Sequence, residues 1–142
     1  VYPKFFHLLA ALRDDGRRLG VATTKPVATG RAVLEHFALN QFFETVSGAV
    51  SDVERTGKAD IVGDALGALG ITAGPHVVLV GDRSHDVVGA HAVGIECVAV
   101  TWGYGSPGEL AGAGADYVVA DVDELATLLG VELATDGDEA RA

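Results

Sequence analysis

The chain has 142 residues, which is enough for one domain with a hydrophobic core. Hydrophobic residues make up 49% of it and glycine contributes 19 residues, a composition that excludes a disordered chain and suits an α/β domain with many tight turns. The formal net charge of -10 argues against nucleic acid as a partner, because phosphate backbones attract basic surfaces. The same charge repels phosphorylated ligands, so any anion site must be local, and a metal ion would help it.

Other features of the chain bear on its location and partners. The single cysteine, Cys97, cannot form an intrachain disulfide, and its apolar neighbours predict a buried thiol. No run of about 18 apolar residues is present, so no membrane partner is expected. Residues 1–4 lack the charged and then apolar layout of a signal peptide, and we expect a cytoplasmic location.

Segments with apolar residues at helical spacing alternate along the chain with short, nearly continuous apolar runs. The first half of the sequence predicts a helix that carries residues 5–12 and stops at Gly16, then a strand over 19–23. A helix follows with Pro26 in its first turn and Val33, Leu34 and Phe37 on one face, and after it a strand over 42–50 and a polar loop over 51–57. The second half predicts a helix over 58–69, a strand over 76–80, a helix ending at 93, strands over 96–101 and 117–120, and a helix over 121–129.

This alternation predicts an α/β fold, a Rossmann-like, doubly wound parallel sheet in three α/β/α layers. The run 76–80 predicts a strand buried on both faces, and 42–50 a strand near the sheet edge. One core domain is expected over residues 1–130, with an acidic tail over 131–142 that frays from residue 134. Ligands of such folds bind at the carboxyl ends of the strands, so polar residues there are candidates.

Two groups of polar residues stand at such positions in the first half of the chain. Thr23, Thr24 and Lys25 follow the first predicted strand, where a hydroxyl and free backbone amides can hold phosphate oxygens. The alternative is that Thr24 only caps the next helix. Lys58 opens the third predicted helix, an unfavourable place for a lysine in the helix dipole. It therefore either interacts elsewhere or points to solvent.

Two carboxylates bracket the end of the strongest predicted strand. Asp82 follows it directly and Asp86 lies one turn into the next helix, so both side chains can face the same cleft. Paired carboxylates at a strand end suit Mg²⁺, which takes oxygen ligands and keeps several waters. The alternative is structural: Asp82 or Ser84 caps the helix, and Asp86 interacts with its dipole. His85 is expected to be exposed, because Mg²⁺ disfavours imidazole.

Together these groups resemble motifs of the haloacid dehalogenase (HAD) superfamily, in the order that family uses. The segment 21–26 resembles the second motif, an apolar strand ending in Thr or Ser. Lys58 and the helix after it resemble the third motif, and 77–86 resembles the fourth. The segments 101–105 and 115–119 resemble segments of phosphoglycolate-phosphatase-like members of the family. The resemblance covers almost the whole chain.

The resemblance implies a Mg²⁺-dependent phosphatase that acts on a small phosphorylated substrate. Members transfer the phosphoryl group of an ester to an aspartate and then hydrolyse the product. Thr23 would hydrogen-bond a phosphoryl oxygen, and Thr24 and Lys25 of the same turn would help to bind the phosphate. Lys58 would neutralise the nucleophile and the transferring group. Asp82 would ligate Mg²⁺, and Asp86 would support the ion directly or through water. These roles suit phosphoryl transfer, which depends mainly on positioning and charge stabilisation.

One part of the family pattern is missing. The first motif, an apolar strand ending in Asp-x-Asp-Gly-Thr, supplies the nucleophile and the general acid/base, and no segment here matches it. Asp121 does follow an apolar run, but we interpret it as a helix cap. The family's helical cap domain is missing as well. The chain starts at Val1 and contains no methionine, so we expect a fragment that lacks the family's first strand.

By resemblance that strand lies between the strands ending at Thr23 and Asp82. We therefore expect a gap in the core, no phosphatase activity from this chain alone, and marginal stability or self-association. Two other functions stay open. One is a non-catalytic domain that binds phosphate and Mg²⁺, and the other is a HAD-like phosphotransferase that passes phosphate to a protein hydroxyl.

Overall fold

The structure, a computed structural model, describes residues 3–49, 57–103 and 106–133. Helices and strands alternate along these residues. The helices are α1 (Pro3–Asp14), α2 (Val27–His36), α3 (Lys58–Leu69), α4 (Ser84–Ala92), α5 (Pro107–Gly112) and α6 (Val122–Leu129), with a short 3-10 helix, η1 (Asn40–Phe42). The strands are β1 (Gly20–Pro26), β2 (Thr45–Ala49), β3 (Val78–Gly81), β4 (Glu96–Val100) and β5 (Tyr117–Val119).

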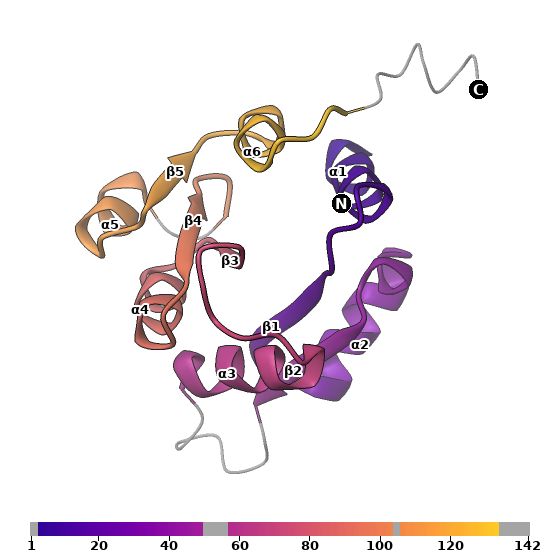
Figure 1. The fold of residues 1–142 in the computed structure, drawn as a ribbon, viewed down its shortest axis with the longest axis horizontal. Helices are drawn as coiled ribbons and strands as arrows, with labels where there is room; N and C mark the ends of the chain where they lie inside the picture. Colours follow the sequence, from indigo (N-terminus) through magenta and orange to yellow (C-terminus); the bar gives the residue numbers. More distant parts are fainter. Residues whose placement is uncertain (1–2, 50–56, 104–105, 134–142) are drawn as a thin grey trace.

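The strands form two parallel sheets, with the helices arranged around them (Figure 1). β1 pairs with β2, and β3, β4 and β5 form the second sheet in that order. Within the described residues β1 and β3 do not pair with each other. The break in the sheet therefore falls between the two strands where the resemblance predicts a further strand.

Two hydrophobic clusters cover opposite faces of the three-stranded sheet. One packs α1 and α6 against Val98 and Val100 of β4. The other packs α3 and α4 against Cys97 of the same strand. Because successive side chains of a strand point to opposite faces, helices lie on both sides of the sheet. This is the three-layer α/β/α arrangement that the sequence predicts.

Some predicted elements differ from the structure. β3 begins at Val78, and Val80 is 39% exposed, so the prediction of a strand buried on both faces is wrong there. The physical reason is that β3 pairs only with β4 among the described strands, which leaves one side of it with few neighbours. Residues 40–42 form η1, and β2 begins at Thr45, at a sheet edge as predicted. The sequence did not predict α5.

The second helix also differs in detail from the prediction. Pro26 is the N-cap residue of α2 and does not lie in its first turn. Val33 and Phe37 are exposed. Leu34 alone of the three predicted face residues packs against the cluster formed by Leu9 and its neighbours.

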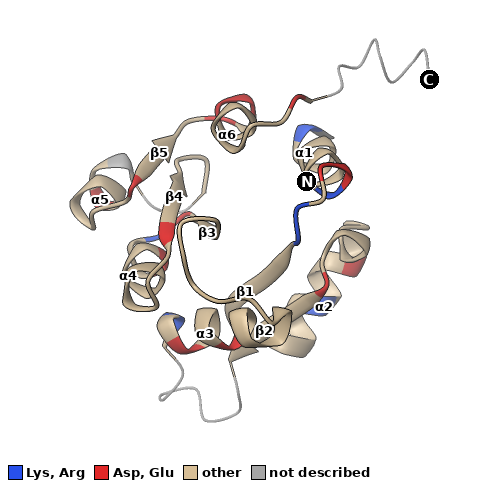
Figure 2. Ribbon diagram, in the orientation of Figure 1, with Lys and Arg blue, Asp and Glu red and all other residues tan. Residues whose placement is uncertain are grey.

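Two further observations bear on the surface. Among the described residues no helix is both long and apolar enough to cross a membrane. Acidic residues are spread over several helices, so the negative charge is not gathered on one element (Figure 2). The acidic tail predicted over 131–142 lies outside the described residues from residue 134 onward.

Candidate active site

Lys58 is buried, so the interpretation of it as a solvent-facing lysine is wrong. It is the first residue of α3, and its side chain is 9% exposed. Its Nζ lies 2.9 Å from Asp86 Oδ1 and donates a 2.6 Å hydrogen bond to the carbonyl oxygen of Ala22 in β1. α3 packs against both β1 and α4, and Lys58 connects β1 to the first turn of α4. Since an ammonium group has three N–H donors, one donor remains for a ligand.

Asp86 organises the turn between β3 and α4. Its Oδ2 accepts hydrogen bonds from the backbone N–H groups of Asp82, at 3.0 Å, and Arg83, at 3.1 Å. Arg83 is the N-cap residue of α4, so the second bond is part of a capping box. A structural role is therefore confirmed for Asp86, whereas neither Asp82 nor Ser84 is the N-cap. With Lys58 on Oδ1, three donors share the two carboxylate oxygens.

Asp82 follows the last residue of β3 and is half-buried. Its side chain lies against Gly103, where an added Cβ would collide with it. Gly81 packs equally closely on Asp86, since a Cβ at Gly81 would lie 2.5 Å from the Cβ of Asp86. Both glycines therefore allow backbone to approach the carboxylates more closely than any side chain would.

Thr23, Thr24 and Lys25 form a bulge at the end of β1. The pairing with β2 shifts register after Ala22, which leaves these three residues outside the regular ladder. Thr23 Oγ1 accepts a 3.1 Å hydrogen bond from the backbone N–H of Lys25. A Cβ at Gly48 would lie 2.5 Å from the carbonyl oxygen of Lys25, so the bulge rests directly on β2. Thr24 is exposed and is not the N-cap of α2, so the capping alternative is wrong.

These contacts join the predicted groups into one site. A continuous series runs from Ala22 O to Lys58 Nζ, to the Asp86 carboxylate and to the Asp82 amide. Thr23 is the next residue after Ala22, and the bulge follows. The site therefore lies at the carboxyl ends of β1 and β3, as expected for a parallel α/β fold.

Sequence reasoning missed Glu109. This residue of α5 has its Oε2 2.9 Å from the Ser84 backbone N–H and 3.4 Å from Arg83 Nε. The hydrogen bonds from Ser84 and Arg83 hold the pKa of Glu109 below its usual value. Ser106 followed by Pro107 could have indicated the start of α5, because Ser106 caps it. No local pattern links Glu109 to Ser84, which lies 25 residues earlier.

His85 and Asp121 have the positions that the sequence predicts. His85 is exposed, with its Nε2 3.8 Å from Asp86 Oδ1. Asp121 is the N-cap of α6, and its Oδ1 accepts a 2.8 Å hydrogen bond from the Glu124 backbone N–H. Asp123 forms an exposed ion pair with Lys4. The cap interpretation of Asp121 is confirmed.

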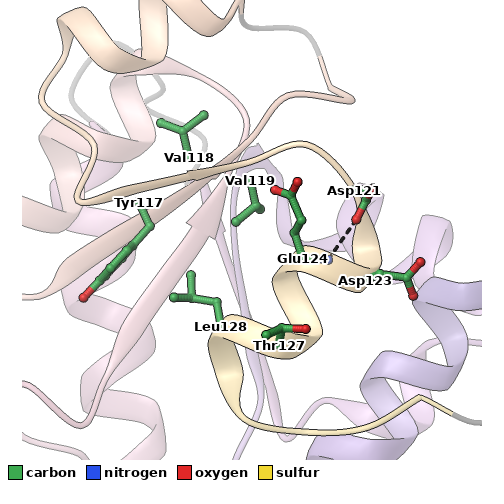
Figure 3. Close-up of a pocket in the computed structure, with 8 residues that line it drawn as sticks. All are labelled: Tyr117, Val118, Val119, Asp121, Asp123, Glu124, Thr127 and Leu128. Atoms are coloured by element: carbon green, nitrogen blue, oxygen red, sulfur yellow. Dashed lines mark hydrogen bonds between the residues drawn. The ribbon is translucent and has the colours of Figure 1, made fainter.

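A hollow of about 560 Å³ lies between β5 and α6 (Figure 3). It is lined by Tyr117, Val118, Val119, Asp121, Asp123, Glu124, Thr127 and Leu128. Figure 3 shows Asp121 turned toward Glu124, in keeping with its cap role. None of the predicted site residues lines this hollow, so it is separate from the candidate active site.

The metal ligands available to the site are oxygen atoms. Within residues 3–49, 57–103 and 106–133, no group of three or more His, Cys, Asp and Glu side chains is placed to hold a metal ion. Asp82, together with the oxygen of Asp86 that contacts Lys58, supplies two carboxylates. Mg²⁺ is bound through one or two carboxylates and keeps several waters, so these residues fit that ion.

Outside the site, Cys97 and Asp116 have shifted pKa values. Burial raises the pKa of the Cys97 thiol to about 12, and the Asp86 and Asp116 carboxylates add to the effect. Cys97 is fully buried, as predicted. His91 Nε2 lies 2.7 Å from Asp116 Oδ2, which also accepts a hydrogen bond from the Cys97 amide. The contacts with His91 and then Cys97 lower the pKa of Asp116.

Several known proteins are similar to the chain, among them proteins named as a kinase and as phosphatases. The chain is 45% identical over 126 residues to the tyrosine-protein kinase PtkA of Mycobacterium tuberculosis, which covers 87% of this chain and 43% of that protein. It is 36% identical over 129 residues to a plasmid-encoded phosphoglycolate phosphatase of Cupriavidus necator, with 91% of this chain and 55% of the relative covered. The chain therefore spans about half the length of the curated relatives it matches.

Solved structures are similar to the chain as well. A predicted phosphatase from Clostridium acetobutylicum superposes with a TM-score of 0.84 and 37% identity, over 91% of this chain and 59% of that one. Residues 1–100 match the model of a family described as haloacid dehalogenase-like hydrolase. The motifs at the ends of β1 and β3, the α/β/α core and these matches agree, and the chain belongs to the haloacid dehalogenase-like hydrolase family, with phosphoglycolate-phosphatase-like features.

Proposed function

We propose that this chain carries the phosphate- and Mg²⁺-binding part of a phosphatase that acts on a small phosphate ester. The observation that carries the proposal is the burial of Lys58 between the Ala22 carbonyl and the Asp86 carboxylate. A buried ammonium held by two acceptors keeps its third N–H in a fixed direction, which suits a phosphoryl oxygen.

Each candidate residue then has one task. Thr23 and the bulge that it forms with Thr24 and Lys25 hold the oxygens of the phosphoryl group. The Lys25 backbone N–H, which donates to Thr23 Oγ1, orients that hydroxyl. Lys58 stabilises the negative charge that the group carries during transfer. Asp82 ligates Mg²⁺. The Asp86 carboxylate orients Asp82 by accepting the hydrogen bond from the Asp82 backbone N–H. The metal ion, when bound, supplies further charge stabilisation for the transferring group.

We also propose that turnover needs an aspartate nucleophile that these 142 residues do not supply. The sequence contains no Asp-x-Asp-Gly-Thr, and the best alternative, Asp121, already caps α6. The lack of pairing between β1 and β3 supports a further strand between them in the working enzyme. The isolated chain should therefore bind Mg²⁺ and phosphate weakly without hydrolysing esters.

A binding experiment tests the site without requiring activity. Mg²⁺ is titrated into the isolated chain while amide chemical shifts are followed by NMR. The largest shifts should fall on residues 81–86 and should be lost in Asp82→Asn, while Asp121→Asn keeps them. Shifts that are largest elsewhere, or that survive Asp82→Asn, would refute the metal assignment.

An activity assay tests the missing nucleophile. The isolated chain is incubated with p-nitrophenyl phosphate and Mg²⁺, and no sustained turnover is expected. Turnover that disappears in Asp121→Asn would make Asp121 the nucleophile and overturn the proposal. Turnover that ignores Asp121 but is lost in Asp82→Asn would indicate a metal-activated water.

A second candidate function is transfer of phosphate to a protein hydroxyl. It is favoured by the 45% identity to a protein named a tyrosine-protein kinase. The two functions separate in the full-length protein supplied with radiolabelled ATP and a tyrosine-containing protein. Label on the protein indicates the phosphotransferase, whereas free phosphate released from simple esters indicates the phosphatase. If the protein binds Mg²⁺ and phosphate but carries out neither reaction, the result supports the non-catalytic binding domain.

A further inference from the structure

We infer that Glu109 is a positioning residue that holds the metal-binding turn in place from α5. This inference rests on the proposed Mg²⁺ site at Asp82, and it adds a residue outside the three motif groups. Glu109 would not touch the ion or the substrate. Its carboxylate acts on the backbone that carries Asp82.

The hydrogen bonds of the turn after β3 carry the argument. Three consecutive backbone N–H groups, those of Asp82, Arg83 and Ser84, all donate to carboxylates. Asp86 accepts the first two and Glu109 accepts the third, at 2.9 Å. Asp86 is local to the turn, whereas Glu109 comes from another helix. The Glu109 contact therefore fixes the turn relative to the rest of the fold.

The segment after β4 contacts this turn directly at one described residue and supports Glu109 at another. Near its start, Gly103 packs directly on the Asp82 side chain. At its end, Ser106 caps α5 by accepting a 3.1 Å hydrogen bond from the Glu109 backbone N–H. The cap fixes the backbone position of Glu109, and the Glu109 carboxylate accepts the hydrogen bond from the Ser84 backbone N–H. The side chain of Asp82 therefore packs on Gly103, and the turn that carries its backbone is hydrogen-bonded to Glu109.

The arrangement also bears on which ligand binds here. The N-terminal amides of a helix ordinarily attract anions such as phosphate. At the start of α4, the amides of Asp82 in the turn, of the N-cap Arg83 and of Ser84 already donate to two carboxylates, which leaves local negative charge. This end of α4 is therefore suited to a cation, and the phosphoryl group is left to the bulge of β1 and to Lys58.

The experiment compares two glutamates that make the same kind of contact. Glu109→Ala removes the acceptor for Ser84, and Glu109→Gln keeps an amide oxygen in its place. Glu124→Ala is the matched control, because Glu124 Oε2 also accepts a 2.9 Å hydrogen bond from a backbone N–H, that of Ala120, but in α6. Mg²⁺ binding to residues 81–86 is measured by amide chemical shifts, and the thermal midpoint is recorded for each variant.

Glu109→Ala should weaken Mg²⁺ binding about tenfold, a typical effect for a residue that orients a metal ligand. Glu109→Gln should recover most of the affinity, and Glu124→Ala should leave it unchanged even if its thermal midpoint falls as much. Wild-type affinity in Glu109→Ala, or an equal loss in Glu124→Ala, overturns the inference.

Failure of the proposed metal site would look different. In that case the wild-type chain would show no Mg²⁺ response in residues 81–86. The metal-free spectra then decide the role of Glu109 by themselves. Altered Asp82 and Ser84 amide shifts in Glu109→Ala would support its hold on the turn, and unaltered shifts would overturn it.

Discussion

Lys58 Nζ lies 2.9 Å from Asp86 Oδ1, and the two side chains are 9% and 6% exposed. Removing two charges from water costs several kcal/mol, which their attraction offsets only with good geometry and further hydrogen bonds. Those bonds are present, because Lys58 also reaches Ala22 O and Asp86 also accepts two backbone amides. A buried pair of this kind is weak evidence for the stability of the fold by itself.

Removing one partner of this pair should be strongly destabilising. Lys58→Met leaves the Asp86 charge buried without its cation, and the free energy of unfolding should fall by about 3–5 kcal/mol. Lys4→Met is the matched control, since the Lys4–Asp123 pair is 64% and 58% exposed and should contribute about 1 kcal/mol or less. Urea unfolding of the three chains measures both. Similar losses for the two variants would contradict the burial of Lys58.

A methyl group at Gly103 should disturb the metal site. Gly103→Ala forces the Asp82 side chain aside, because the new Cβ would collide with it, and Mg²⁺ affinity should fall about tenfold. Gly108→Ala is the control, since a Cβ there meets nothing within 4 Å. Isothermal titration with Mg²⁺ gives the two affinities. Unchanged binding in Gly103→Ala would show that Asp82 is free to adjust or does not bind the ion.

The pair of Asp116 and His91 should make stability depend on pH. Because the pKa of Asp116 is lowered in the folded chain, its contribution is present at neutral pH and is lost as the pH falls through that lowered value. Asp116→Asn should therefore reduce the free energy of unfolding near pH 7 by about 1 kcal/mol or less, since the pair is partly exposed. The difference from wild type should shrink in acid. Asp14→Asn, an exposed carboxylate 77% accessible, should show no such trend.

The Cys97 thiol should be inert in the folded chain. With its pKa raised to about 12, almost no thiolate exists at pH 8, and the side chain is also fully buried. Its reaction with iodoacetamide should be at least about a hundredfold slower than that of the same chain in denaturant. Rapid labelling under native conditions would mean that β4 opens readily between α4 and the rest of the core.

Local patterns in the sequence predicted much of the fold. The spacing of apolar residues predicted α1, α3, α4 and α6, because one helical face must be apolar to pack on a sheet. Gly16 was predicted to stop the first helix, and it adopts the left-handed conformation that a glycine tolerates best. The order of Thr23, Lys58, Asp82 and Asp86 along the chain also predicted a site at the strand ends. The helices and their ends depend on residues within a few positions of each other, whereas the prediction of the site depends on the resemblance to the family's motifs.

Only the tertiary structure decided which of these residues interact. From its sequence, Lys58 could equally have faced solvent. Its partner Ala22 lies 36 residues before it, on β1, and its partner Asp86 lies after it, in α4. Glu109 and Ser84 are also distant in sequence, and the break between β1 and β3 is visible only in the strand pairing. The reason is physical: burial and ion pairing depend on which surfaces meet after folding, and a sequence pattern with a period of two or 3.6 residues carries no information about that meeting.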